Sequence, residues 1–214
     1  RAILMSRLSN EPDISVIATA SNANEGRELI KRFDPDVVTL DIEMPGMNGL
    51  QFLEETMRDR PMPVVMLSTL TQKGAKASIE AARLGAVDSF PKPTSTSMEE
   101  FNRLAPKLAA LVIAAASGKV LSTEERHERR ARRPAAASNF RWNGKMIAIG
   151  GSTGGVEALF DLLPRFPENC PPTVIVQQFG SGFTDALIEE LDSVTHAKVV
   201  PAVDGTRIEQ GHIY

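Results

Sequence analysis

The sequence has little cysteine, few aromatic residues and no long apolar run, and each shortage narrows what the protein can be. Cys170 is the single cysteine, so no disulfide can form within the chain, which suits a reducing compartment. Aromatic residues make up 5% of the 214 residues, so a core must be built mainly from aliphatic side chains. No apolar run reaches the roughly 18 residues of a membrane-spanning helix. The net charge of −3 gives no general reason to expect nucleic-acid binding.

Short β-rich runs alternate with helical patterns along most of the chain. The runs typical of strands cover residues 14–18, 36–40, 63–67, 86–90, 146–150, 173–176 and 198–202. The helical patterns cover residues 25–33, 50–57, 75–84, 98–116, 155–163 and 183–191. This alternation predicts an α/β protein with parallel sheets and helices on both faces. In such sheets the active residues are expected at the carboxyl ends of strands.

Composition divides the chain into three parts. Residues 1–117 form one alternating unit, residues 118–143 read as a charged linker, and residues 144–214 begin a second α/β unit. The linker loses apolar periodicity and includes a basic run that could contact nucleic acid or an acidic surface, although composition favours a solvated linker, helical in part at most. Residues 1–8 already read as an amphipathic helix and a strand begins near Tyr214, so we expect a fragment.

Three polar residues follow three successive predicted strands. Asp41, Ser68 and Lys92 come just after the strands, and parallel strands would bring their side chains into one pocket. Taken singly, an Asp at a strand end is usually a turn former and a Lys-Pro pair is usually loop chemistry. Together they suit a phosphoryl site: the carboxylate attacks, the ammonium neutralises phosphate oxygens and the hydroxyl donates a hydrogen bond.

Residues 1–117 resemble the receiver domain of bacterial two-component response regulators, which has a flavodoxin-like fold. The matching pieces are residues 35–49 (PDVVTLDIEMPGMNG), residues 63–68 (PVVMLS), Gly-Ala at 85–86 and Lys-Pro at 92–93. The resemblance implies that Asp41 is the phosphoacceptor, Ser68 the switch hydroxyl and Lys92 the phosphate-binding cation. It also implies Mg²⁺ as cofactor, bound by Asp41 and the backbone carbonyl of Glu43.

The chain departs from the receiver pattern in two places. Receivers carry an acidic pair after their first strand that holds Mg²⁺, and this chain begins inside the following helix, so we expect both the strand and the pair to be missing. The family often has an aromatic residue three positions before the lysine, where this chain has Ser89, with Phe90 one step later.

A second motif is the glycine-rich run at residues 150–155 (GGSTGG), between a predicted strand and a helix. Such a turn exposes Ser152 at the helix start, where free backbone N–H groups suit an oxyanion or a phosphate. The spacing of a dinucleotide site and the lysine of a phosphate-binding loop are both absent. On the motif alone, Ser152 or Thr153 could instead be an ordinary helix cap.

In context, this motif resembles the catalytic domain of the chemotaxis response regulator protein-glutamate methylesterases. Further matching pieces are residues 157–159 (EAL), 174–177 (VIVQ), 182–184 (GFT), 204–205 (DG), 211–214 (GHIY) and, in the first unit, 60–71 (RPMPVVMLSTLT). The resemblance implies Ser152 as nucleophile, with Gly151, Thr153 and Gly154 forming the turn near the oxyanion. It implies hydrolysis of glutamate methyl esters on chemoreceptors and deamidation of receptor glutamines, with no cofactor for ester hydrolysis.

The same resemblance implies partners and a location. A chemotaxis histidine kinase would phosphorylate the protein, and methyl-accepting chemoreceptors would be its substrates. We expect a cytoplasmic monomer that is not inserted in a membrane and binds no nucleic acid.

The family's catalytic histidine is missing here. It follows the glutamine of the second strand, and this chain has Gln177 and then Gln178 at that place. An amide does not titrate near neutral pH, so Gln178 cannot act as a general base. The family's aspartate would lie beyond residue 214. We interpret His127, His196 and His212 as surface or structural residues rather than replacement bases, and Cys170 as an inert thiol.

Three functional hypotheses remain open. The first is a phosphorylation-gated methylesterase, here truncated and inactive. The second is a non-catalytic, receiver-controlled binding module or phosphate sink. The third is a response regulator with a DNA-binding output, supported only by the basic linker, since no helix-turn-helix pattern follows.

Overall fold

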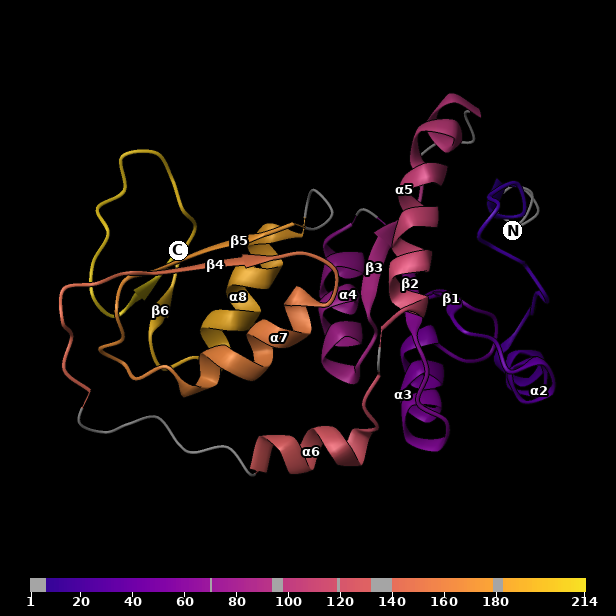
Figure 1. The fold of residues 1–214 in the computed structure, drawn as a ribbon, viewed down its shortest axis with the longest axis horizontal. Coiled ribbons are helices and arrows are strands. Elements are labelled where there is room, and N and C mark those ends of the chain that lie inside the picture. Colours follow the sequence, from indigo (N-terminus) through magenta and orange to yellow (C-terminus); the bar gives the residue numbers. More distant parts are fainter. Residues whose placement is uncertain (1–6, 70, 94–97, 119, 132–139, 179–182) are drawn as a thin grey trace.

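The computed structural model describes residues 7–69, 71–93, 98–118, 120–131, 140–178 and 183–214. Two parallel sheets lie in separate lobes of an elongated molecule (Figure 1). The first lobe holds the N-terminal part of the chain and the second holds the C-terminal part. The predicted α/β class with parallel sheets is therefore confirmed.

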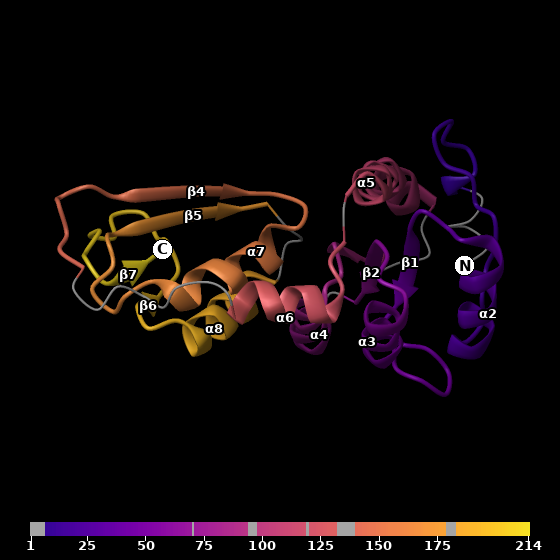
Figure 2. The same ribbon diagram turned by 60° about the horizontal axis from the view of Figure 1, so that its bottom comes forward.

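The first sheet has the strand order β1-β2-β3. Its strands are β1 (Val38–Asp41), β2 (Val64–Ser68) and β3 (Asp88–Pro91). Helix α5 (Met98–Ala116) covers one face, and α2 (Ala23–Phe33), α3 (Gly49–Asp59) and α4 (Gln72–Leu84) lie on the other side (Figure 2). Alternate residues of β2 face the two layers. Val65 packs in a buried cluster with Leu108 of α5 (the α5 cluster), and Met66 packs in another with Phe52 of α3.

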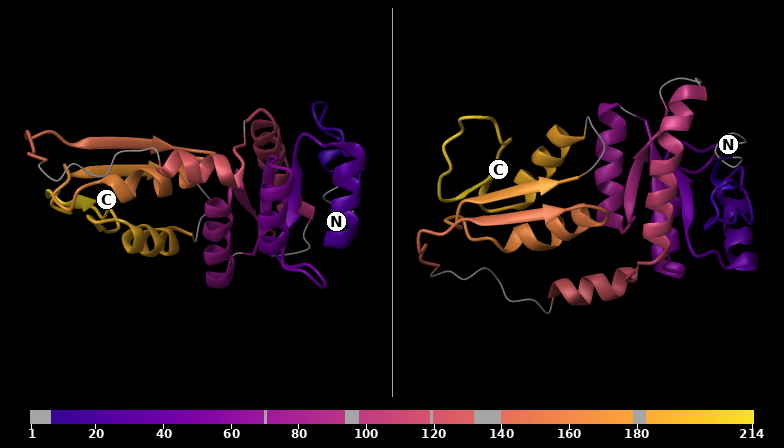
Figure 3. Two further views of the ribbon diagram at one scale, coloured as in Figure 1. Left: turned by 90° about the horizontal axis from the view of Figure 1, so that it is seen from below. Right: turned by 45° about the horizontal axis from the view of Figure 1, so that its top comes forward.

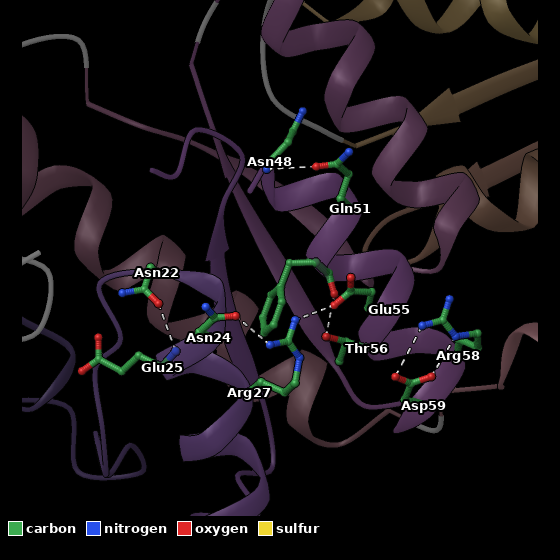
Figure 4. A network of polar contacts seen from close by, with 11 residues as sticks. Asn22, Asn24, Glu25, Arg27, Asn48, Gln51, Glu55, Thr56, Arg58 and Asp59 are labelled. Carbon is green, nitrogen blue, oxygen red and sulfur yellow. Dashed lines mark hydrogen bonds and ion pairs between the residues drawn. The ribbon is translucent and has the colours of Figure 1, made fainter. Parts of the chain in front are cut away.

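Caps and ion pairs fix helix α3, which begins directly after the loop that follows Asp41. Asn48 and Gln51 form a capping box: the Asn48 side chain accepts from the first turn, and Gln51 Oε1 accepts from Asn48 N at 3.3 Å. Arg27 of α2 pairs with Glu55 of α3 at 2.7 Å (Figure 4). The N–H of Gly49 donates to Ile42 O at 2.9 Å, which holds the start of α3 beside the end of β1.

The second sheet has the strand order β4-β5-β7-β6. Its strands are β4 (Ile147–Gly151), β5 (Thr173–Gln177), β6 (Lys198–Val199) and β7 (His212–Ile213). Helix α7 (Gly155–Leu162), a 3₁₀ turn (Leu163–Arg165) and α8 (Thr184–Val194) lie on one face of it (Figures 2 and 3). Within the described residues the other face is open, and Val176 is 70% exposed there.

Helix α4 belongs to both lobes. Its Ile79 is buried in the core of the second lobe, together with Leu159 of α7 and Leu187 of α8. A short helix, α6 (Thr123–Ala131), lies in the predicted linker between the lobes (Figure 1). The carboxyl ends of β4 and β5 point toward α4 (Figures 1 and 3).

Two predicted strands differ in the structure. The strand predicted over residues 14–18 is wrong, because this segment pairs with no strand in the described part of the chain. Its side chains still alternate, with Ile14 and Val16 packed in the α5 cluster and Ile17 48% exposed. The sequence pattern therefore indicates which side chains are buried, and it does not indicate hydrogen bonding to a neighbouring strand. The strand predicted over residues 198–202 ends at Val199, and Pro201 has no N–H to extend it.

The helix predicted over residues 1–8 lies mostly outside the described residues. Among the helices that the structure describes, none combines the length and apolar character needed to cross a bilayer.

Candidate functional site

The first candidate site joins Asp41 and Lys92 at the carboxyl edge of the first sheet. Asp41 is paired with Leu67 in the parallel register, and the N–H of Lys92 donates to Ser68 O at 2.7 Å. This register brings Lys92 Nζ to 2.6 Å from Asp41 Oδ1, with the two side chains 26% and 36% exposed. A partly desolvated ion pair of this kind is a site where a phosphoryl group would find both a nucleophile and a cation.

Both contacts of the Asp41 carboxylate in the described part of the chain fall on Oδ1. The second donor is the backbone N–H of Glu43, at 2.9 Å. Within the described residues no group of three or more His, Cys, Asp or Glu side chains gathers as a metal site. Asp41 and the Glu43 carbonyl could supply two oxygen ligands to Mg²⁺, which prefers six, so these residues alone do not complete a magnesium site.

Ser68 lies at the end of β2, but its hydroxyl is engaged elsewhere. The residue is fully buried, and Oγ donates to the carbonyl of Gly74 in the first turn of α4 at 3.0 Å. The structure therefore places Ser68 on the correct strand end, and its hydroxyl holds the start of α4 rather than the Asp41–Lys92 pair.

The second candidate site lies where β4 and β5 end. Gly151 and Gln177 are paired in register, so Ser152 and Gln178 follow the two strands side by side. Ser152 Oγ donates to Gln178 Oε1 at 3.4 Å, and both residues are exposed. A contact of this length is at the weak end of hydroxyl hydrogen bonds.

The helix-cap interpretation of Ser152 and Thr153 is wrong. The N-cap of α7 is Gly154, and no side chain makes a cap hydrogen bond to it. Gly154 has φ 76°, a conformation that glycine adopts without the penalty of a Cβ. The hydroxyl of Ser152 is therefore left free of helix capping.

The other histidines do not approach this site. Strand β7 pairs with β5 only through Thr173 and Ile213, so His212 lies about 16 Å back along the sheet from Gln177. His196 precedes β6 at the same amino-terminal edge and is exposed. The His127 side chain lies outside what the structure describes, as do most arginine side chains of the basic run.

Cys170 has the environment of an unreactive thiol. It is fully buried in the core of the second lobe. Burial raises the pKa of the Cys170 thiol, which keeps it protonated and suppresses the thiolate that would react.

One residue at the second site was missed by sequence reasoning. The carboxamide of Gln177 donates from Nε2 to the carbonyl of Ser152 at 2.8 Å and to that of Gln178 at 2.9 Å. The signal that could have found it was the pair Gly151 and Gly155, each of which faces this carboxamide.

Comparison with known proteins agrees with both lobes. The protein-family model for the response regulator receiver domain matches residues 1–101, and the family model for the CheB methylesterase matches residues 147–214. The chain is 46% identical, over its whole length, to a protein-glutamate methylesterase/protein-glutamine glutaminase of Rhizobium etli, and 46% identical to its namesake from Agrobacterium fabrum. It spans 60% of the length of each of these relatives.

A solved structure resembles the first lobe. The response regulator domain of Thermotoga maritima CheB matches with a TM-score of 0.50 and 36% identity, over 55% of this chain and 88% of that domain. With both models matched in this order and homologues matched along the whole chain, the chain belongs to the family of chemotaxis response regulators that join a receiver domain to a CheB methylesterase domain.

Proposed function

We propose that the protein is a phosphorylation-regulated protein-glutamate methylesterase of bacterial chemotaxis whose serine site, as it stands, lacks the base that ester hydrolysis needs. The observation that carries this proposal is the contact of Ser152 Oγ with Gln178 Oε1 at 3.4 Å, at the ends of paired strands. Ser152 occupies the nucleophile's place, and the residue that meets it cannot take its proton.

The reaction would proceed by acyl transfer. Ser152 Oγ would attack the ester carbonyl of a methylated receptor glutamate, its proton would pass to a base at position 178, and methanol would leave with that proton. Water would then hydrolyse the acyl-serine to give glutamate; for a glutamine substrate, ammonia would leave instead. Gln178 accepts the hydroxyl hydrogen bond but does not accept the proton, so Ser152 stays neutral and weakly nucleophilic.

Control would come from the first lobe. Asp41 is the proposed phosphoacceptor, Lys92 the cation that pairs with the phosphoryl group, and Mg²⁺ the cofactor for this step. A chemotaxis histidine kinase would be the partner that supplies the phosphoryl group. A phosphoryl group on Asp41 would compete for the Ser68 hydroxyl, which now bonds Gly74 of α4. Since α4 packs against α7 and α8, a shift of α4 would reach the second lobe.

A second candidate function is a non-catalytic binding module or phosphate sink. The observation that favours it is again Gln178, because a hydroxyl and a carboxamide can hydrogen-bond an ester or amide without cleaving it. Phosphorylation of Asp41 would then control binding to chemoreceptors rather than hydrolysis.

Methanol release from methylated chemoreceptor membranes distinguishes the two candidates. The full-length protein is assayed unaltered, as Gln178→His and as the double variant Gln178→His with Ser152→Ala, each with and without acetyl phosphate. We expect no release from the unaltered protein, and a gain of about 10²–10⁴-fold from Gln178→His, which is the usual contribution of a general base. Adding Ser152→Ala should remove that gain.

Three outcomes would overturn parts of this proposal. Release by the unaltered protein that disappears with Ser152→Ala would refute the claim that Gln178 disables the site. A Gln178→His protein that binds methylated receptors but releases no methanol would leave the binding module as the function. Phosphodonor stimulation that survives Asp41→Asn would refute the assignment of Asp41.

A further inference from the structure

The side chain of Gln177 ties together the backbones of the two residues that meet at the serine site. Gln177 is the last residue of β5, and its Nε2 donates to Ser152 O at 2.8 Å and to Gln178 O at 2.9 Å. Both N–H bonds of one carboxamide are thus used on the main chain of Ser152 and Gln178. The backbone adds one more link, from Gln178 N to Gly151 O at 2.9 Å.

Two glycines make the space that this carboxamide occupies. A Cβ at Gly151 or at Gly155 would overlap Gln177 Oε1. Neither glycine has a positive φ, so their backbone conformation does not require glycine. The requirement at both positions is close approach of the Gln177 side chain to the strand end and to the first turn of α7.

The carboxamide is held there at some cost. Gln177 Oε1 is buried, and among the described residues it has no hydrogen-bond partner. An unpartnered buried carbonyl is unfavourable, because burial removes the water that would otherwise hydrogen-bond to it. An apolar side chain of similar size would fill the same slot without that cost, but it would have no N–H groups for the two carbonyls. The role of Gln177 therefore lies in the two N–H groups of its carboxamide, which donate to the two carbonyls.

We infer that Gln177 is a positioning residue, which sets the distance between the Ser152 hydroxyl and whichever side chain stands at position 178. This inference rests on the proposed function, in which Ser152 is the nucleophile. The hydroxyl lies at the limit of hydrogen-bond reach from position 178, at 3.4 Å, so a small shift of either strand end separates the two groups. A misplacement of about 1 Å can lower a rate by 10²-fold.

The first experiment uses the full-length Gln178→His protein, in which position 178 carries a base. Gln177→Leu keeps the bulk and removes both donors, and we expect kcat for methanol release to fall at least about 10-fold with KM little changed. Gln177→Glu keeps the shape of the side chain. The ionised carboxylate repels the two backbone carbonyls, and the protonated carboxylic acid can donate to one of them. The rate of Gln177→Glu relative to the Gln177 parent should therefore rise as pH falls, whereas a residue that only fills space would give a ratio independent of pH.

The second experiment tests the slot itself. Gly151→Ala should lower kcat in the Gln178→His protein because the new methyl group displaces the carboxamide. In a Gln177→Ala background the oxygen is gone, so Gly151→Ala should cost little more. Gly150→Ala is the matched control, since nothing lies within 4 Å of a Cβ at Gly150. Equal losses from Gly151→Ala in both backgrounds would overturn the inference.

A third readout separates this inference from the proposed function. A fluorophosphonate that labels nucleophilic serines is reacted with the same variants, and Ser152→Ala gives the blank. If labelling depends on Gln177 while no variant releases methanol, the positioning role stands and the esterase proposal fails. The melting temperature of Gln177→Leu checks that this variant is folded. If it is labelled as fast as its parent and also retains kcat, the positioning role is refuted.

Discussion

The two candidate sites are built in the same way and differ in what their side chains can do. Each lies at the carboxyl ends of parallel strands, which are neighbours in the second sheet (β4 and β5) and stand on either side of β2 in the first (β1 and β3). In the first lobe the result is a charged pair, Asp41 with Lys92 at 2.6 Å. In the second it is a neutral pair, Ser152 with Gln178 at 3.4 Å. Strand register therefore supplies proximity, and the residue identities decide whether chemistry follows.

The largest effect expected from this comparison is on phosphorylation. Asp41→Asn removes the carboxylate proposed as the nucleophile, so incorporation of phosphate from acetyl phosphate or kinase into the full-length protein should be lost. Ser152→Ala and Gln178→His should leave incorporation unchanged, because the charged pair does not include the second site. The exposed Asp36→Asn, five residues upstream, is a matched control. Incorporation that persists in Asp41→Asn would show that another group accepts the phosphoryl group.

The next effect concerns a second carboxylate of the first sheet. Asp88 begins β3, and desolvation raises its pKa from the ordinary 3.8 to about 6, with the Ser89 N–H opposing that rise. Because the folded-state pKa is raised, Asp88 favours folding fully only below about pH 4, and this contribution is lost as pH rises through 6. Asp88→Asn, which does not titrate, should stabilise the protein at pH 8 by up to about 3 kcal/mol and little at pH 4.

Urea unfolding followed at pH 4 and pH 8 measures this difference. Asp204→Asn, an exposed carboxylate of the second lobe, controls for the change in net charge. An Asp88→Asn protein that is no more stable than the unaltered protein at pH 8 would contradict the burial of this carboxylate. The result would sharpen the contrast between the lobes, since burial raises the pKa of Asp88 whereas the hydrogen bond with Lys198 lowers the pKa of Asp192 in the second lobe.

A smaller effect is expected where the lobes are joined. Arg126 of α6 is buried, donates to Leu84 O at the end of α4 at 2.6 Å, and pairs with Glu157 of α7 at 3.8 Å. It lies against Gly85, which has φ 105°, and a Cβ there would overlap the guanidinium. Gly85→Ala should therefore destabilise the protein by about 1–3 kcal/mol and loosen α7 from α4.

Hydrogen exchange of the α7 amides measures that loosening, and urea unfolding measures the total cost. Gly144→Ala is the matched control, because Gly144 has φ 81° and nothing lies within 4 Å of a Cβ there. It carries the backbone strain without the clash, so it should cost less and leave α7 protected. Equal costs for both variants would show that Arg126 does not depend on Gly85.

The sequence predicted the elements around both sites because local patterns determine them. Asp41 ends its strand, and Lys92, Ser152 and Gln178 each follow theirs by one residue; these strand ends lie within one residue of the prediction because the apolar runs are unambiguous. Residues 14–18 show the limit, because alternation cannot reveal whether a ladder partner exists. The role of Gln177 and the burial of Ile79 against the second lobe depend on distant parts of the chain meeting. No local pattern encodes such meetings.

The smallest effects belong to the exposed ion pairs between the lobes, and they test whether charge or packing joins them. Lys76 pairs with Glu189 at 3.7 Å and Arg83 with Glu190 at 3.8 Å. Exposed pairs of this kind contribute about 0–1 kcal/mol. Arg83 also lies over the Phe160 ring, 5.6 Å from its centroid, which adds a contact that Lys76 lacks.

Lys76→Gln should therefore change the free energy of unfolding by less than about 0.5 kcal/mol, and Arg83→Gln by somewhat more, about 0.5–1 kcal/mol. The pair contribution should shrink in 1 M salt, because charges at this distance are then screened, whereas the ring contact should persist. Urea unfolding of both variants at low and high salt measures the two parts. If Lys76→Gln and Arg83→Gln lose stability equally and both losses vanish in salt, the ring contact contributes nothing. The lobes would then be held at α4 by the buried Ile79 contacts and by Arg126, and the charged rim would only orient them.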